Sequence, residues 1–397
     1  MLAAGTLAQA SFSASSVGLP ALGPAVKSHY GLTLGQTGVV LGAIGIGMLF
    51  TLLPWGLVAD RVDERWVIAT GLTGAGALLA VAATTQTFAA VTGALVAVGA
   101  LGASVNAASG RAIMTWFPST ELGMALGIRQ TIPIGGAIAA AVLPSFASAG
   151  GTRLAFLFLA AACFVGALAA ATFIRSGARA EPRVGEVSRP LRDTRMWLLG
   201  TGTGLYLVAQ IALTGFVVLF LHDHRHVSKE GAGAVLAVIY VLAIAARIGS
   251  GRISDRLGSR LRPLRTIGIA LALSTACVAV ATEAPLPLVV TAFVVAGVLS
   301  MSWNGLSYAS AAEMAGSART GAALGFQQTL LGVIVAGAPA VVAVVAGHSW
   351  RLAFFLAAAG PAAGVLVLRR LGEPEARRLA RTPGTSATLP AARRTPD

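Results

Sequence analysis

Two arginines lie inside long apolar stretches of this sequence, where an ionisable side chain is costly to place. Arg129 follows Glu121 by eight residues and Arg247 precedes Asp255 by eight, so each lies about 12 Å along a helix from a charged helix end. A charge at the centre of a bilayer costs about 2.5 to 3.5 kcal/mol on insertion scales, which makes each arginine a candidate for function. Guanidinium groups bind carboxylate or phosphate through forked hydrogen bonds. The pair therefore predicts an anionic ligand.

Each arginine also has a structural interpretation, in which it reaches the membrane surface or bonds backbone carbonyls. All fifteen acidic residues are expected in loops, tails or helix ends, so no buried carboxylate is expected to neutralise either arginine. Other polar residues within the apolar stretches extend the candidate binding set, although such residues also hold membrane helices together. The candidate substrate-binding residues are Arg129, Arg247, Asn106, Gln130, Tyr206, Gln210, Asn304, Tyr308 and Gln327.

The composition indicates a protein whose solvent is lipid. Of the 397 residues, 56% are hydrophobic and 11% are charged, whereas charged residues make up about 25% of soluble domains. A bilayer core about 30 Å thick needs about 20 apolar residues per helix, so the chain can supply about a dozen spans. Its net charge of +14 comes mostly from arginines between apolar runs and near the C-terminus. Such arginines indicate orientation in a membrane and not a nucleic-acid partner.

The apolar runs predict an all-α integral membrane protein with twelve transmembrane helices in two pseudo-symmetric bundles of six. The expected first-half spans are 2–25, 34–59, 66–85, 89–114, 121–147 and 153–174. Those of the second half are 196–221, 231–255, 266–283, 286–311, 320–346 and 349–370. The expected domains are an N-terminal bundle at 1–175, a cytoplasmic linker at 176–195, a C-terminal bundle at 196–371 and a disordered cytoplasmic tail at 372–397.

Basic loops set the expected orientation. Residues 175–195 carry six arginines and residues 256–265 carry four, so both segments and both termini should be cytoplasmic. The bias towards Ala, Gly and Arg, with Lys27 and Lys229 as the only lysines, indicates a GC-rich bacterial genome. The bacterial plasma (inner) membrane is therefore the expected location, and a single chain is expected to act as a monomer.

An internal repeat relates the two halves at an offset of 198 residues. Residues 125–131, ALGIRQT, fall on residues 323–329, ALGFQQT, with five of seven positions identical. At the same offset RLAF at 153–156 falls on RLAF at 351–354. Parallel repeats of six spans are a known transporter architecture.

A second repeated element follows spans two and eight. It reads GLVADR at 56–61 and GRISDRLGSR at 251–260. This element resembles the loop signature of the major facilitator superfamily, and with the repeat the resemblance covers nearly the whole chain. The first copy departs from the signature, because Asp63 and Glu64 replace the usual glycine and basic residue. In the family this loop controls the cytoplasmic gate, which implies gating roles for Asp60, Arg61, Arg111, Asp255 and Arg256.

The resemblance also implies that spans five and eight face each other, which would place Arg129 and Arg247 beside one pathway. The segment at 246–251, ARIGSG, is similar to the eighth-span arginine pattern of monocarboxylate and oxalate carriers. Organophosphate carriers of the family have phosphate-binding arginines in spans one and seven. This chain has none there, so an organophosphate is disfavoured.

These features together predict alternating-access transport of a small organic anion across a lipid bilayer, without a cofactor, a metal or catalysis. One alternative is a proton-coupled multidrug or metabolite exporter, although Leu95 occupies the place of the arginine typical of such exporters. Another is a receptor derived from a transporter. The alternating histidines of 222–226 could ligate zinc, but a solvated external loop is the preferred interpretation.

Overall fold

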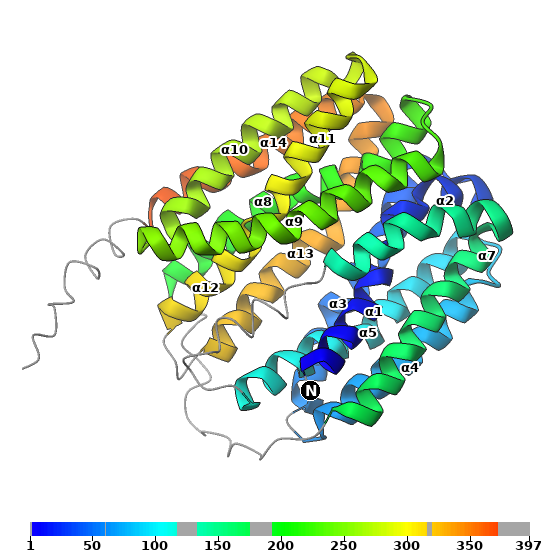
Figure 1. Cartoon of the computed structure of the whole chain (residues 1–397), viewed down its shortest axis with the longest axis horizontal. Coiled ribbons are helices and arrows are strands. Elements are labelled where there is room, and N and C mark those ends of the chain that lie inside the picture. Colours follow the sequence, from blue (N-terminus) through cyan, green and yellow to red (C-terminus); the bar gives the residue numbers. More distant parts are fainter. Residues whose placement is uncertain (1, 60, 117–132, 175–192, 316–319, 372–397) are drawn as a thin grey trace, which may run out of the picture.

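The computed structural model describes residues 2–59, 61–116, 133–174, 193–315 and 320–371, and the described residues form helices joined by short loops (Figure 1). The linker expected at 176–195 is described only from residue 193, and the tail expected at 372–397 lies outside these ranges. The helices of the first half are α1 (Leu2–Ser16), η1 (Leu19–Leu22), α2 (Gly23–Tyr30), α3 (Leu34–Ala59), α4 (Glu64–Ala82), α5 (Phe88–Trp116) and α7 (Pro133–Phe173). Those of the second half are α8 (Thr194–Leu219), η3 (Phe220–His224), α9 (Lys229–Leu257), α10 (Leu261–Val280), η4 (Ala281–Glu283), α11 (Leu286–Met301), α12 (Asn304–Ala315), α13 (Thr320–His348) and α14 (Trp350–Arg369).

Twelve membrane crossings follow from these helices. Within the described residues, ten helical segments are long and apolar enough to cross a membrane, and one of them joins α11 with α12. Another, α7, contains two crossings, because Gly150 and Gly151 leave the helical conformation and Gly151 adopts a left-handed φ of 68° that favours glycine. The segment from α1 through η1 to α2 supplies the remaining crossing (Figure 1). The predicted all-α membrane fold of twelve spans in two bundles is confirmed.

Each bundle is held together by close helix packing. In the first, α3 packs on α5, while α4 packs on α5 and α7; in the second, α14 packs on α8 and α10, and α9 packs on α11. Glycines bring the backbones together: a Cβ on Gly47 would lie 1.9 Å from the carbonyl oxygen of Val96, and one on Gly364 would lie 2.4 Å from that of Gly202. Small residues at helix contacts are typical of membrane bundles, where van der Waals packing drives association.

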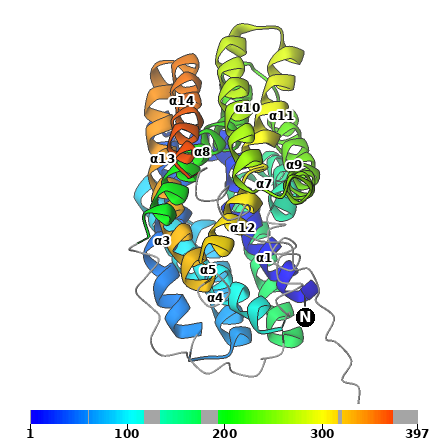
Figure 2. The same cartoon turned by 90° about the vertical axis from the view of Figure 1, so that its left-hand side faces the viewer.

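The two halves contact each other through α3 with α13 and through α7 with α9. A Cβ on Gly38 would lie 2.3 Å from the Cβ of Ala343, and one on Gly233 would lie 2.6 Å from the carbonyl oxygen of Ala140. These contacts lie towards the end of the molecule that carries α2 and η3, here called the Lys27 end. The opposite end, which carries the loop after α9, is called the Asp255 end, and the bundles lie farther apart there (Figures 1 and 2).

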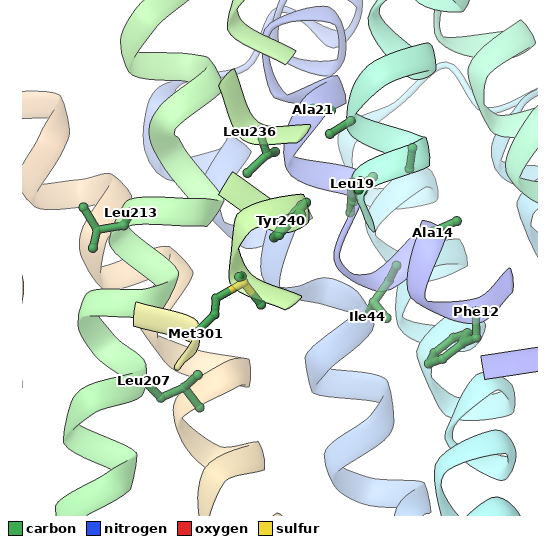
Figure 3. Close-up of a cluster of buried hydrophobic side chains, with 14 of the residues drawn as sticks. Phe12, Ala14, Leu19, Ala21, Ile44, Leu207, Leu213, Leu236, Tyr240 and Met301 are labelled. Carbon is green, nitrogen blue, oxygen red and sulfur yellow. The ribbon is translucent and has the colours of Figure 1, made fainter. Parts of the chain in front are cut away.

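A cluster of buried apolar side chains crosses the boundary between the halves (Figure 3). Phe12, Leu19 and Ile44 come from the first half, and Tyr240 and Met301 come from the second. The Tyr240 hydroxyl donates to the carbonyl oxygen of Val17, 2.8 Å away. That carbonyl lies at the break between α1 and η1, so the hydrogen bond satisfies a group that a continuous helix would have paired.

Candidate functional site

The tenth span is broken within the second bundle. Helix α11 ends at Met301 and α12 begins at Asn304, so backbone groups at the break need partners from elsewhere. Helix α9 supplies them: Arg247 Nε donates to the carbonyl oxygen of Met301 at 2.8 Å, and Ser250 Oγ donates to that of Ser302 at 2.9 Å. Arg247 thus bonds a backbone carbonyl, as its structural interpretation required.

Arg247 also reaches a second candidate residue. Its Nη2 donates to Oδ1 of Asn304, 3.2 Å away, and the two side chains come from α9 and α12. Asn304 is 9% exposed, while Arg247 is half-buried. Tyr308 lies one helical turn beyond Asn304, on the same face of α12. The structure therefore groups Arg247, Asn304 and Tyr308 on the side of α12 that faces α9.

Three further candidates lie around the adjacent face of α12. Gln327 of α13 donates from its amide nitrogen to Oγ of Ser307. The ring of Tyr206, on α8, meets the ring of Trp303 edge-on with centroids 6.0 Å apart, and its hydroxyl donates to the carbonyl oxygen of Leu264 at 3.3 Å. Gln210 follows Tyr206 by one turn of α8. These side chains lie near the start of α12 inside the second bundle, where Trp303 and Gln327 are fully buried.

The remaining binding candidates are not part of this group. Asn106 of α5 accepts a hydrogen bond of 3.0 Å from Gln9 of α1, within the first half. Arg129 and Gln130 lie outside the described residues. Sequence reasoning missed Trp303 and Ser250, although the run Ser302-Trp-Asn-Gly305 places three weak helix formers together in an apolar span and could have indicated the break.

The second copy of the loop signature forms a charged cluster at the Asp255 end. Arg260 Nη1 lies 2.5 Å from a carboxylate oxygen of Asp255, and its Nε lies 2.9 Å from one of Glu313 on α12. Burial alone would lower the pKa of Arg260, but its hydrogen bonds to Glu313 and Asp255 raise the pKa above the usual value. Gly258, with φ of 59°, ends α9 in the left-handed conformation before this cluster. The cluster ties the loop after α9 to α12.

The other gating candidates are described less fully. Arg61 and Arg256 are exposed, whereas Asp60 lies outside the described residues. Arg111 lies in α5, at a position whose side chain is not described. Glu64, which departs from the signature, is 8% exposed in the first turn of α4.

Two polar contacts join the halves at the Lys27 end. Lys27 Nζ lies 2.5 Å from a carboxylate oxygen of Asp223, and Ser148 Oγ donates to a carboxylate oxygen of Glu230 at 2.6 Å. Within the histidine run, His224 Nε2 lies 2.8 Å from a carboxylate oxygen of Glu283. Among the described residues, no group of three His, Cys, Asp or Glu side chains is placed to hold a metal ion.

Twelve crossings in two repeated bundles of six are a known architecture of membrane transporters. The chain belongs to the Major Facilitator Superfamily, whose family profile matches residues 4–339 and, in a second match, 199–396. The second match begins near the start of α8, as a repeat of the first half would require. The protein is therefore a multi-pass membrane transporter of small molecules, not an enzyme.

Curated relatives agree with this assignment. Two proteins described as uncharacterized MFS-type transporters, from two strains of Mycobacterium tuberculosis, are each 30% identical over 332 residues. Each match covers 81% of this chain and 73% of the relative.

Solved structures share the fold at low sequence identity. The nucleoside transporter NupG and a bacterial homologue of the human lysosomal transporter Spinster, the latter inward-facing and occupied, each match with a TM-score of 0.73 and 15% identity. These matches cover 93% and 96% of this chain and 98% and 96% of the solved chains, respectively. The human organic anion transporter MFSD10 matches with a TM-score of 0.71 and 15% identity over 93% of this chain and 98% of its own. At this identity the likeness shows the fold alone.

Proposed function

We propose that this protein transports a small organic anion by alternating access, with Arg247 as a binding group for the anion. The observation that carries the proposal is a guanidinium within span eight that bonds the Met301 carbonyl and the Asn304 side chain, both of which are neutral. Every carboxylate among the described residues lies in a loop or near a helix end. A guanidinium at this position can bind a carboxylate through forked hydrogen bonds, so an anionic substrate suits the site.

The orientation is part of the proposal. The arginines of the loop after α9 favour a cytoplasmic Asp255 end, with both termini on that side and the Lys27 end outside. The halves then meet near the outer surface and diverge towards the cytoplasm, so the structure corresponds to an inward-facing state. Bundle boundaries at 1–175 and 196–371, a cytoplasmic linker and tail, and a bacterial inner-membrane location complete this arrangement, with a monomer as the working unit.

Any coupling of transport to proton movement would use a group on the substrate itself. The carboxylates nearest to α12 are held at the Asp255 end, where Glu313 is 56% exposed and pairs with Arg260. A mid-span carboxylate that could carry a proton is absent from the described ranges. Exchange, uniport, or symport in which the substrate carboxylate brings the proton would therefore suit the chain better than a proton relay of its own.

The test is uptake of labelled small carboxylates into proteoliposomes that contain the parent or a variant. Arg247→Gln and Arg129→Gln should each lower carboxylate uptake by about tenfold or more, since a charge-assisted hydrogen bond contributes about 1.5 to 3 kcal/mol. Arg153→Gln is the matched control, because Arg153 is exposed near Gly151 and its substitution removes the same charge. Movement of cationic or neutral compounds but of no carboxylate would show that the anion proposal is wrong.

A further inference from the structure

The start of α12 presents polar groups on two neighbouring faces. Asn304 and Tyr308 share the face towards Arg247, while Trp303 and Ser307 share the face towards α8 and α13. The two faces are one residue apart on the helix, so they meet along one edge of α12. A ligand bound at Arg247 and Asn304 would therefore also lie beside the second face.

That second face carries buried polar atoms that the described residues leave unpaired. The indole Nε1 of Trp303 and the amide Oε1 of Gln327 have no hydrogen-bond partner there, and both side chains are 0% exposed. The buried amide Oε1 of Gln210, whose side chain is half-buried as a whole, likewise has no partner among the described residues. Buried polar groups are paired in the great majority of cases, so an unpaired group at a candidate site points to a ligand that would pair it.

The residues that carry these unpaired atoms are linked by contacts or by one turn of a helix. Gln327 bonds Ser307, which is one turn from Trp303; Trp303 in turn contacts the Tyr206 ring. Gln210 lies one turn, or about 5.4 Å, beyond Tyr206 on α8. All of them belong to the second half, as does Arg247, so they move together when the halves rock.

The start of α12 also favours negative charge. Its twelve residues begin at Asn304, and the first turn of a helix presents backbone N–H groups and the positive end of the helix dipole. Broken helices in other transporters direct such ends at anionic substrate groups. Together with Arg247, this end would hold a carboxylate, and the unpaired groups would then face the remainder of the bound molecule.

We propose that this site selects carboxylates that carry a second, neutral hydrogen-bonding group, such as a hydroxyl, over simple aliphatic carboxylates. This inference rests on the proposed transport of an organic anion and adds its substrate class. The indole N–H of Trp303 can only donate and the unpaired Oε1 of Gln327 can only accept, so a hydroxyl, which does both, can pair with either group. A site built to bond a hydroxyl disfavours the analogue that lacks one, because its own buried groups then stay unpaired.

The experiment compares proteoliposome uptake of glycolate with acetate and of lactate with propionate. The parent should prefer the hydroxylated member of each pair by about tenfold or more. Trp303→Phe keeps a ring against Tyr206 but removes the N–H, and should bring the preference for the hydroxylated member close to one. Gln327→Met gives the same expectation through a second residue, should Trp303→Phe fail to fold. Trp350→Phe, in the aromatic cluster with Phe354, should keep the preference of the parent.

The outcomes separate the two proposals. Equal uptake of hydroxylated and simple carboxylates by the parent overturns the present inference and leaves anion transport standing. A preference that persists in both Trp303→Phe and Gln327→Met also overturns it, because the unpaired groups then select nothing. If the parent takes up none of the four carboxylates, nor any other in the labelled panel, the proposed function fails and this inference fails with it.

Discussion

Lys27 and Asp223 form an ion pair between the two halves of the transporter, with Nζ 2.5 Å from a carboxylate oxygen. Lys27 lies in the last turn of α2 in the first half, and Asp223 lies in η3 of the second, 196 residues later. Their side chains are 33% and 24% exposed, so the pair is only partly shielded from solvent. It can form only while the halves are together at this end.

Breaking the ion pair should favour separation at the Lys27 end. A partly exposed pair contributes up to about 1 kcal/mol, which corresponds to a change of about fivefold in the ratio of the two states. A cysteine at Ala343, in a chain without its native cysteines, would report this separation. Ala343 is 0% exposed and lies against Gly38, so a reagent can reach a cysteine there only when the halves separate. Its labelling by a water-soluble maleimide should be faster in Asp223→Asn.

Exchange of the two charges is the control for this effect. The double variant Lys27→Asp with Asp223→Lys restores opposite charges across the same gap and should return labelling close to the parent rate. Labelling of the double variant as fast as that of Asp223→Asn would mean that the charge pair does not hold the halves together.

The contact of α3 with α13 should tolerate no side chain at Gly38. A Cβ there would lie 2.3 Å from the Cβ of Ala343 and 2.6 Å from the carbonyl oxygen of Pro339. Gly38→Ala should therefore destabilise the state in which α3 contacts α13 by about 1 to 3 kcal/mol. Gly35→Ala is the matched control, because the added Cβ would lie 3.6 Å from a side-chain carbon of Val344, which is an ordinary van der Waals contact. We expect slower transport for Gly38→Ala alone, and equal rates for both would refute the packing argument.

Arg247 should contribute to both stability and binding. Arg247→Gln removes the hydrogen bond to the Met301 carbonyl at the break in span ten, and an unpaired buried carbonyl costs about 1 to 3 kcal/mol. The thermal midpoint should therefore fall by a few degrees. A transported carboxylate should raise the midpoint of the parent through mass action but not that of the variant. If the ligand raises both midpoints equally, Arg247 is structural only.

The charged cluster at the Asp255 end should depend on Arg260. Arg260→Gln loses ion pairs with Asp255 and Glu313 at 2.5 and 2.9 Å, and we expect a loss of about 1 kcal/mol in stability together with an altered transport rate. Arg262→Gln removes one positive charge from the first turn of α10, two residues further on, at an exposed position. An Arg262→Gln effect as large as that of Arg260→Gln would indicate general charge loss and not the cluster.

Much of the fold could be predicted because lipid imposes a simple rule on the sequence. Apolar runs separated by arginines predict twelve spans. The expected boundary between spans five and six, from residue 147 to residue 153, contains the two glycines at which α7 leaves the helical conformation. The breaks at Val17–Gly18 and Ser302–Trp303 were missed. Both lie inside long apolar runs, and hydropathy averaged over a whole span does not resolve a break of two residues.

The candidate site could be predicted only in part. The rarity of polar residues in apolar runs identified both Arg247 and Asn304, but their contact depends on how α9 meets the broken span. The partners of Lys27 and Trp303 depend likewise on residues far away in the sequence. Such pairings are fixed by tertiary packing, which a single sequence does not display.

Distances between spin labels on the two halves test alternating access most directly. In a chain whose two native cysteines are replaced, one labelled pair would join exposed Gln86 and His348 at the Lys27 end, and another would join Val62 and Leu257 at the Asp255 end. Upon addition of a transported carboxylate, the first distance should lengthen in part of the population while the second shortens. Distances that stay unchanged, or that change in the same direction at both ends, would contradict the account.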